Sequence, residues 1–185
     1  MITLYFGPMF SGKTNMLLTH EQISYRSKHT VSIIFVKYIH DQRYSTSNQV
    51  ISHSGQQNLE QTKVVMTDSL LSMFEQLTQY NIIYIDEGQF YKDIHDFLKR
   101  VSREFPDIEI YISGLSGDYK QEPFSTISSI IPLCEKIVHL QSLCHKCGKN
   151  ASFTERLTQD TQQEVIGGND MYLPICYKCL NKKTT

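Results

Sequence analysis

The sequence lacks any long hydrophobic run, any internal repeat and any low-complexity tract. Its longest apolar runs are short, such as IIFV at residues 33–36, whereas a membrane-spanning helix needs about 20 apolar residues. The first residues, MITLYF, also lack the basic segment that opens a secretory signal peptide. These absences argue against an integral membrane or secreted protein, and we expect a cytoplasmic chain with no membrane partner.

An excess of one charge sign is also missing. The chain has 18 Lys and Arg residues against 19 Asp and Glu residues, for a formal net charge of -1. Nucleic-acid-binding proteins usually carry a surplus of positive charge, so we expect no nucleic-acid partner. Hydrophobic residues make up 40% of the 185, which suffices for an ordinary core in one domain, or in one domain with a small appendage.

Apolar strand candidates alternate with helix candidates over the first 140 residues. We predict strands at residues 2–6, 31–38, 64–66, 82–85, 108–113 and 136–140, and helices at 13–27, 68–79 and 92–104. The first helix should place Met16, Leu17, His20, Ile23 and Ser24 roughly on one face, and Thr67 or Asp68 should cap the second. This alternation predicts an α/β fold with a mostly parallel sheet and helices on both faces, with ligands at the carboxyl edge of the sheet.

The character of the chain changes after residue 140. Aliphatic residues become sparse, and two cysteine pairs and a Gly-Gly pair appear. A segment of this size rarely builds its own core and needs a covalent or metal staple. We therefore predict two domains, an α/β domain at residues 1–140 and a small C-terminal domain at residues 141–185.

Residues 7–14 (GPMFSGKT) match the phosphate-loop pattern G-x-x-x-x-G-K-[ST]. The match lies between an apolar strand and a helix, which is the context that the motif requires, and it favours a P-loop (RecA-like) sheet. Backbone N–H groups and the helix N-terminus would bind phosphate oxygens, Lys13 would neutralise their charge, and Thr14 would offer a hydroxyl to Mg²⁺. We predict that the whole loop binds ATP: Gly7, Pro8, Met9, Phe10, Ser11, Gly12, Lys13 and Thr14.

The predicted strand at residues 82–85 ends directly in Asp86 and Glu87. An aspartate after such a strand is typical of the Walker B position, which holds Mg²⁺ opposite a phosphate loop. Glu87 is then the candidate general base, acting on water in an ATPase or on a substrate hydroxyl in a kinase. Acids at strand ends are often ordinary turn residues, but the phosphate loop upstream favours the functional interpretation.

Four of the five cysteines form two C-x-x-C pairs: Cys144, Cys147, Cys176 and Cys179. Each pair can supply one edge of a tetrahedral Zn²⁺ site, and a site with four thiolates is structural because no position stays open for catalysis. Two disulfides or a redox pair are the alternatives, which the spacing favours less. Cys134 has no partner in the pattern and is predicted to be a small core residue.

Six stretches of the sequence resemble the type II thymidine kinases, which are cellular cytosolic, bacterial and poxviral enzymes. They are GPMFSGKT at 7–14, DQRYS at 41–45, IDEGQF at 85–90, the pattern GL-x-x-DY-x-x-x-PF at 114–124, ASFTERL at 151–157 and VIGGNDMY at 165–172. They occur in the family's order and span nearly the whole chain. Ser116, Tyr119 and Tyr177 depart from residues that are common in the family.

The resemblance implies a chemistry and a set of residues. ATP and Mg²⁺ would be cofactors, with Asp86 at the metal and Gln89 near the bound nucleotide. Glu87 would take the proton from the 5′-hydroxyl of the nucleoside, with Arg43 and Lys13 near the transferring phosphoryl group. The zinc-stapled C-terminal domain would carry a "lasso", residues 163–167, that closes over thymine.

The resemblance also implies a nucleoside site with apolar and aromatic walls. The residues so assigned are Met9, Asp41, Phe90, Leu115, Tyr119, Phe124, Thr154, Gln163, Glu164, Val165, Ile166, Gly167 and Tyr172. Without the resemblance, Phe90 and Phe124 could equally be core aromatics. Arg43, on a polar stretch, would then be read as a solvated charge.

Two function classes remain on the motifs alone. The resemblance implies a thymidine kinase that also accepts deoxyuridine, is inhibited by thymidine triphosphate and forms a homotetramer. The alternative is a nucleic-acid-stimulated P-loop ATPase whose cysteines form a zinc ribbon. Residues 140–185 carry only a small surplus of basic residues, which is a weak footprint for nucleic acid, so we favour the kinase.

Overall fold

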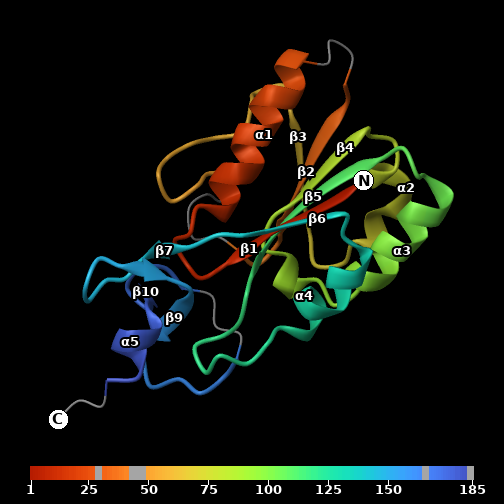
Figure 1. The fold of residues 1–185 in the computed structure, drawn as a ribbon. Coiled ribbons are helices and arrows are strands. Elements are labelled where there is room, and N and C mark those ends of the chain that lie inside the picture. Colours follow the sequence, from red (N-terminus) through yellow and green to blue (C-terminus); the bar gives the residue numbers. More distant parts are fainter. Residues whose placement is uncertain (28–30, 42–48, 164–166, 183–185) are drawn as a thin grey trace.

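The central element is a parallel sheet. The computed structural model describes residues 1–27, 31–41, 49–163 and 167–182 (Figure 1). Within these ranges six strands pair in the order β3-β2-β4-β5-β1-β6, and every pair is parallel. The strands are β1 (Ile2–Gly7), β2 (Ile33–Tyr38), β3 (Lys63–Thr67), β4 (Ile82–Ile85), β5 (Glu109–Leu115) and β6 (Lys136–His139). The predicted α/β fold is confirmed.

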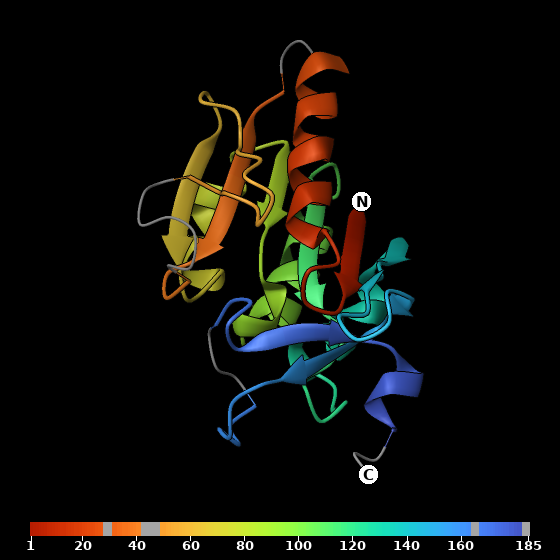
Figure 2. The same ribbon diagram turned by 90° about the vertical axis from the view of Figure 1, so that its left-hand side faces the viewer.

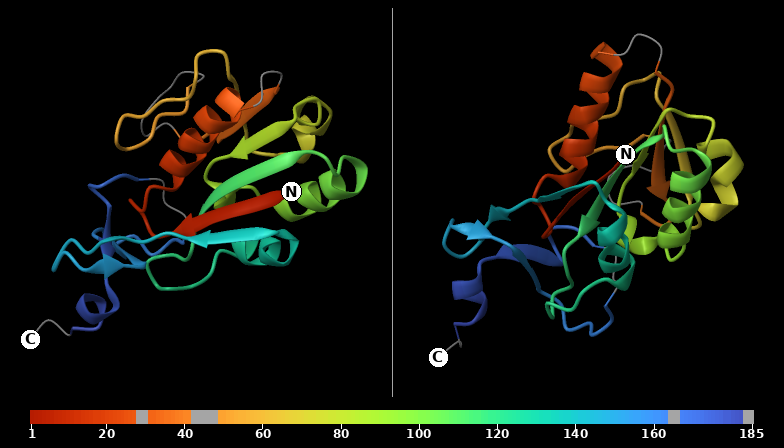
Figure 3. Two further views of the ribbon diagram at one scale, coloured as in Figure 1. Left: turned by 45° about the horizontal axis from the view of Figure 1, so that its top comes forward. Right: turned by 45° about the vertical axis from the view of Figure 1, so that its right-hand side comes forward.

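Helices cover both faces of the sheet, because alternate side chains of each strand enter separate cores. On one face α1 (Lys13–Ser27) packs over Ile82 and Tyr84 of β4. On the other face α2 (Phe74–Leu77), α3 (Ile94–Glu104) and α4 (Ser125–Ile130) pack over Ile83 and Ile85 (Figure 3). Within the described ranges no helix is long and apolar enough to cross a membrane.

Two predictions about the helices are wrong. The helix expected at residues 68–79 is a 3₁₀ turn, Leu71–Met73, followed by the single turn α2. The start of this segment is capped by a residue far along the chain. The carboxylate of Asp93 accepts from the Leu71 N–H at 2.9 Å and from the Ser69 hydroxyl at 2.7 Å. The hydroxyl of Thr67 instead closes the preceding turn by donating to the Ser69 carbonyl.

The buried face of α1 also differs in part from the predicted face. Leu17 and Ser24 are buried as part of it, but Met16 and Ile23 are 36% and 58% exposed, and Leu18 and Glu21, which were not predicted, are fully buried. The helix α4 was not predicted at all, because its sequence STISSI is short and mostly polar. It nevertheless forms, since Ile127 and Ile130 bury against the sheet core.

A small region follows β6 and lies beyond the carboxyl ends of the strands (Figure 2). It contains the hairpin-like pairs β7 (Ser142–Leu143) with β8 (Asn150–Ala151) and β9 (Phe153–Arg156) with β10 (Tyr172–Ile175), and the turn of helix α5 (Tyr177–Leu180). This placement brings β9 and β10 to the edge of the sheet where ligands bind. The division into two domains at residue 141 stays a prediction.

Candidate active site

The phosphate loop joins β1 to α1 at the carboxyl edge of the sheet. Two of its residues have a positive φ, Phe10 at 60° and Gly12 at 80°, so the loop turns sharply before the helix begins. A side chain at the position of Gly12 would be strained, because L-residues rarely adopt this conformation. The ammonium group of Lys13 lies over the loop and donates to the Pro8 carbonyl at 2.7 Å.

Asp86 faces the phosphate loop from the end of β4. The hydroxyl of Thr14 lies 3.1 and 3.2 Å from the two carboxylate oxygens, and the hydroxyl of Ser113 on β5 donates to one of them. Asp86 is only 8% exposed. A carboxylate beside a hydroxyl is the kind of oxygen donor set that Mg²⁺ prefers, so these residues fit the predicted metal.

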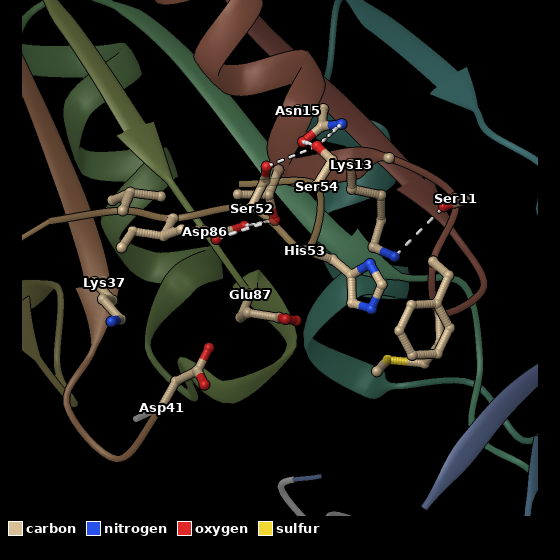
Figure 4. A pocket seen from close by; sticks show the side chains of 16 residues that line it. Ser11, Lys13, Asn15, Lys37, Asp41, Ser52, His53, Ser54, Asp86 and Glu87 are labelled. Carbon is tan, nitrogen blue, oxygen red and sulfur yellow. Dashed lines mark hydrogen bonds between the residues drawn. The ribbon is translucent and has the colours of Figure 1, made fainter. Parts of the chain in front are cut away.

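These groups line the first of two pockets, the phosphate pocket. Its walls also include Lys37 and Asp41 from β2 and the segment after it, together with a β-bridged turn at residues 50–58 (Figure 4). The turn is attached to α1, since the Asn15 side-chain amide donates to the Ser54 hydroxyl at 3.0 Å. The ring of His53 meets the ring of Phe10 edge-on, at 4.9 Å between centroids.

The sequence marks a turn at Ser54-Gly55, in the polar stretch at residues 41–63, but neither this turn nor Lys37 was predicted to line the pocket. The signal for Lys37 was present, because a lysine inside the apolar run at 31–38 is unusual and its side chain is only 7% exposed. Asp41, assigned to the nucleoside, lies in this pocket. Arg43 lies outside the described residues.

The second pocket, the apolar pocket, lies between the sheet edge and strands β9 and β10. Its lining residues are Met9, Glu87, Gln89, Phe90, Leu115, Gly117, Asp118, Tyr119, Phe124, Thr154, Arg156, Gln163, Gly167 and Tyr172. Eleven of them had been singled out from the sequence: Glu87, Gln89 and nine nucleoside-binding residues, of which Met9 was assigned to both sites.

The lasso is described only in part. Gln163 and Gly167 reach the apolar pocket, as does Tyr172, while Glu164, Val165 and Ile166 lie outside the described residues. Gln89 had been assigned to the nucleotide, but its side chain lines the apolar pocket and not the phosphate pocket. Gly7 and Pro8, at the start of the loop, are likewise absent from the lining of the phosphate pocket.

Met9 and Glu87 line both pockets, so the two cavities meet at these residues. Glu87 has a left-handed backbone (φ 55°, ψ 49°), which is uncommon for a residue with a side chain and clusters at functional sites. Its N–H donates to the Ser113 hydroxyl at 3.1 Å. The next residue must be small, because a Cβ at Gly88 would lie 2.8 Å from a methyl carbon of Ile112.

Arg156 on β9 was not predicted, and it organises one wall of the apolar pocket. Its guanidinium lies over the ring of Tyr119, at 4.0 Å from the centroid, and near the ring of Tyr172 at 5.1 Å. It also donates to the carbonyls of Asp160, Gln162 and Gln163 and to the Tyr172 hydroxyl. The available signal was the presence of this arginine in ASFTERL, one of the stretches that resemble the family.

The hydroxyl of Thr154 connects the C-terminal region with the phosphate loop. It accepts from the Met9 N–H at 3.1 Å, and Thr154 is 5% exposed. Ser142 adds a second connection by donating to the Phe10 carbonyl at 3.1 Å. The strand that bears Arg156 is therefore held against the loop that bears Met9.

The four cysteines of the C-x-x-C pairs come together, with their sulfur atoms all within 4.8 Å of one another and none in a disulfide. Burial opposes ionisation of Cys144, but backbone N–H groups, chiefly that of Cys176, outweigh it and lower the pKa to about 6. The neighbouring thiols, first Cys147, raise the pKa of Cys179 to about 12. Four thiols so close cannot all ionise without a cation, so the cluster fits a structural Zn²⁺. Cys134 is half-buried and lies apart from them.

The sheet, the phosphate loop and the acid that faces it define a phosphate-loop α/β fold. A solved structure with a similar fold is the flagellar accessory protein FlaH of Methanocaldococcus jannaschii, with a TM-score of 0.50 over 97% of this chain and 79% of that chain. At 13% identity, that likeness concerns the fold alone.

Residues 1–180 match the family described as "Thymidine kinase". The thymidine kinase of vaccinia virus is 38% identical over 178 residues, which cover 96% of this chain and 95% of the viral enzyme. The monkeypox virus thymidine kinase shares 38% and the variola virus enzyme 37% with the same coverage. The chain belongs to the thymidine kinase family, which confirms the resemblance found in its motifs.

Proposed function

We propose that this chain transfers the γ-phosphoryl group of ATP to the 5′-hydroxyl of thymidine, giving ADP and thymidine monophosphate. The observation that carries the proposal is the position of Glu87 at the junction of the phosphate pocket and the apolar pocket. A nucleoside whose base fills the apolar pocket would direct its sugar hydroxyl towards that junction. Membership of the thymidine kinase family supports the choice of substrate.

The residues of the phosphate pocket would have separate roles in phosphoryl transfer. The loop amides and Lys13 hold the phosphates of ATP in line with the acceptor, which is most of the task in phosphoryl transfer. Mg²⁺, when held by Thr14 and Asp86, would neutralise charge on the phosphate oxygens. Glu87 accepts the proton of the 5′-hydroxyl as general base. Arg43 is proposed as a further cation near the phosphoryl group on the resemblance alone.

The base would lie between the aromatic and apolar walls of the second pocket, with the lasso over it. We propose that backbone groups of residues 163–167 read the base. Thymine offers an acceptor at O4 and a donor at N3, and cytosine inverts both, so cytosine would leave buried groups unpaired. Uracil keeps both groups and lacks only the methyl, which is worth about 1–3 kcal/mol.

The test is a turnover assay with ATP and Mg²⁺ in three parallel reactions, with thymidine, with single-stranded DNA, or with neither. The proposal expects thymidine monophosphate in the first reaction and little ATP turnover in the other two. Stimulation by DNA without nucleoside phosphorylation would favour a nucleic-acid-dependent ATPase instead. With competing nucleosides, kcat/KM should fall about 10–200-fold for deoxyuridine and roughly 10⁴-fold for deoxycytidine.

Because the two pockets meet, one thymidine triphosphate molecule could place its base in the apolar pocket and its phosphates on the loop. We propose that it inhibits in this way, and competition with both thymidine and ATP would be the kinetic signature. A homotetramer is proposed from the family, and light scattering of the purified protein would test it.

A further inference from the structure

Gln89 has a side chain with two fixed hydrogen bonds beside Glu87. Its amide nitrogen Nε2 donates to Glu87 Oε2 at 2.5 Å, and its amide oxygen Oε1 accepts from the Leu115 N–H at 3.1 Å. The side chain is only 1% exposed, so water cannot replace either partner. The backbone is held as well, since the Thr126 hydroxyl donates to the Gln89 carbonyl at 2.9 Å.

The orientation of this amide follows from chemistry. The backbone N–H of Leu115 can only donate, so it requires the oxygen of the Gln89 amide. The nitrogen is then forced to point at Glu87, where it donates to the carboxylate and fixes its direction. Strand β5, which ends at Leu115, thereby sets the direction of a hydrogen bond to the residue at the pocket junction.

We propose that Gln89 is a positioning residue for Glu87: its amide holds the carboxylate aimed at the junction of the two pockets. This inference rests on the proposed function, in which Glu87 is the general base. Gln89 itself need not touch either substrate for this role. Its place in the apolar pocket explains why it would act on the acceptor side of the reaction and not on ATP binding.

The central experiment compares the parent with Gln89→Met, which keeps the length of the side chain and removes both hydrogen bonds. We expect kcat for thymidine to fall at least about tenfold, because a misdirected base loses much of its effect. The KM for ATP should stay within about twofold.

A second variant keeps the proposal testable if Gln89→Met does not fold. Gln89→Glu has the same shape and can still accept from the Leu115 N–H, but as a carboxylate it cannot donate to Glu87. It should lower kcat in the same way at neutral pH. Gln79→Met, an exposed glutamine after α2 that lines neither pocket, is the matched control and should behave like the parent.

A double-mutant cycle separates positioning from mere packing. In a Glu87→Gln background, Gln89→Met should lower kcat by less than about twofold, because two residues that act as a unit are not additive. Equal losses in both backgrounds would overturn the proposal, and so would a kcat like that of the parent in both Gln89 variants. If Glu87→Gln alone leaves kcat unchanged, the general base assigned in the proposed function fails instead, whatever Gln89 does.

Discussion

The sheet region, residues 1–139, and the cysteine region, residues 142–182, keep their shape by different means. The sheet region has two apolar cores, one on each face, in which whole strands and helices are buried. Within its described part the cysteine region has one small cluster, made of Cys144, Ala151, Ile175 and Cys176, and two of these are candidate zinc ligands. A region with so small a core usually needs a staple such as a bound metal, which its four clustered cysteines fit, while a sheet with two cores needs none.

The two regions also contribute differently to the candidate site. Among the described residues, the sheet region alone lines the phosphate pocket, whereas both regions line the apolar pocket, to which the cysteine region supplies Thr154, Arg156 and Tyr172. Changes in the cysteine region should therefore affect nucleoside binding more than phosphate binding. The following predictions, from the largest expected effect to the smallest, test this difference.

Among these predictions, loss of zinc should give the largest difference between the two regions. Cys144→Ser removes one thiolate, so the site cannot close, and we expect loss of the metal and of nearly all thymidine phosphorylation. The sheet region should stay folded and keep its affinity for ATP analogues. Elemental analysis should find about one zinc per chain in the parent and far less in the variant.

Cys134→Ser is the matched control, because that thiol lies outside the cluster, and the variant should keep both zinc and activity. A parent protein that contains no metal and whose four thiols all react freely would contradict the zinc assignment.

Glu87→Gln tests the chemistry alone. The amide has nearly the same shape but cannot accept a proton, so kcat should fall at least about 10²-fold. The KM values for ATP and thymidine should change little, because the size and shape of both pockets stay nearly the same. Steady-state kinetics at saturating Mg²⁺ measure both quantities, and a near-normal kcat would remove Glu87 from the role of base.

Ile83→Ala tests how far the sheet region depends on its core. Ile83 is fully buried in β4, and removal of its side-chain carbons should lower the free energy of unfolding by about 2–5 kcal/mol. The measurement is denaturant unfolding of the zinc-loaded protein, with zinc content checked afterwards. Retained zinc together with the lower stability would show that the two regions are stabilised independently. Loss of zinc in this variant would show that they are coupled.

Arg156→Met is expected to have the smallest effect. It removes a cation over Tyr119 and the donors to three carbonyls before the lasso, so the KM for thymidine should rise roughly tenfold. The KM for ATP should not change. Arg103→Met, an exposed residue in the last turn of α3, is the control and should leave both constants as they are. A lower kcat with an unchanged thymidine KM would contradict this role.

The motifs located most of the candidate site in advance, and local chemistry explains why. A phosphate loop needs glycines, a lysine and a hydroxyl at fixed spacing within one turn. The sequence alone therefore identifies Lys13 and Thr14 as candidate site residues. The strand at 82–85 was predicted with its observed bounds, as was helix 13–27, because apolar runs and the loop before the helix mark their ends. The helix at 68–79 was predicted too long. The group that accepts from its first N–H is the carboxylate of Asp93, which lies far along the chain, so the nearby residues gave no sign of where the helix begins.

By itself the sequence determined the α/β class, the phosphate loop, the acids after β4, the cysteine pairs and the family, because each of these depends on residues that are neighbours along the chain. Only the tertiary structure decided that Glu87 lies where two pockets meet, that Lys37 and the turn at 50–58 line the phosphate pocket, and that Arg156 lies between two tyrosines. These features join segments that the parallel sheet brings to one edge. Their geometry depends on packing and register between strands, which residue spacing does not encode.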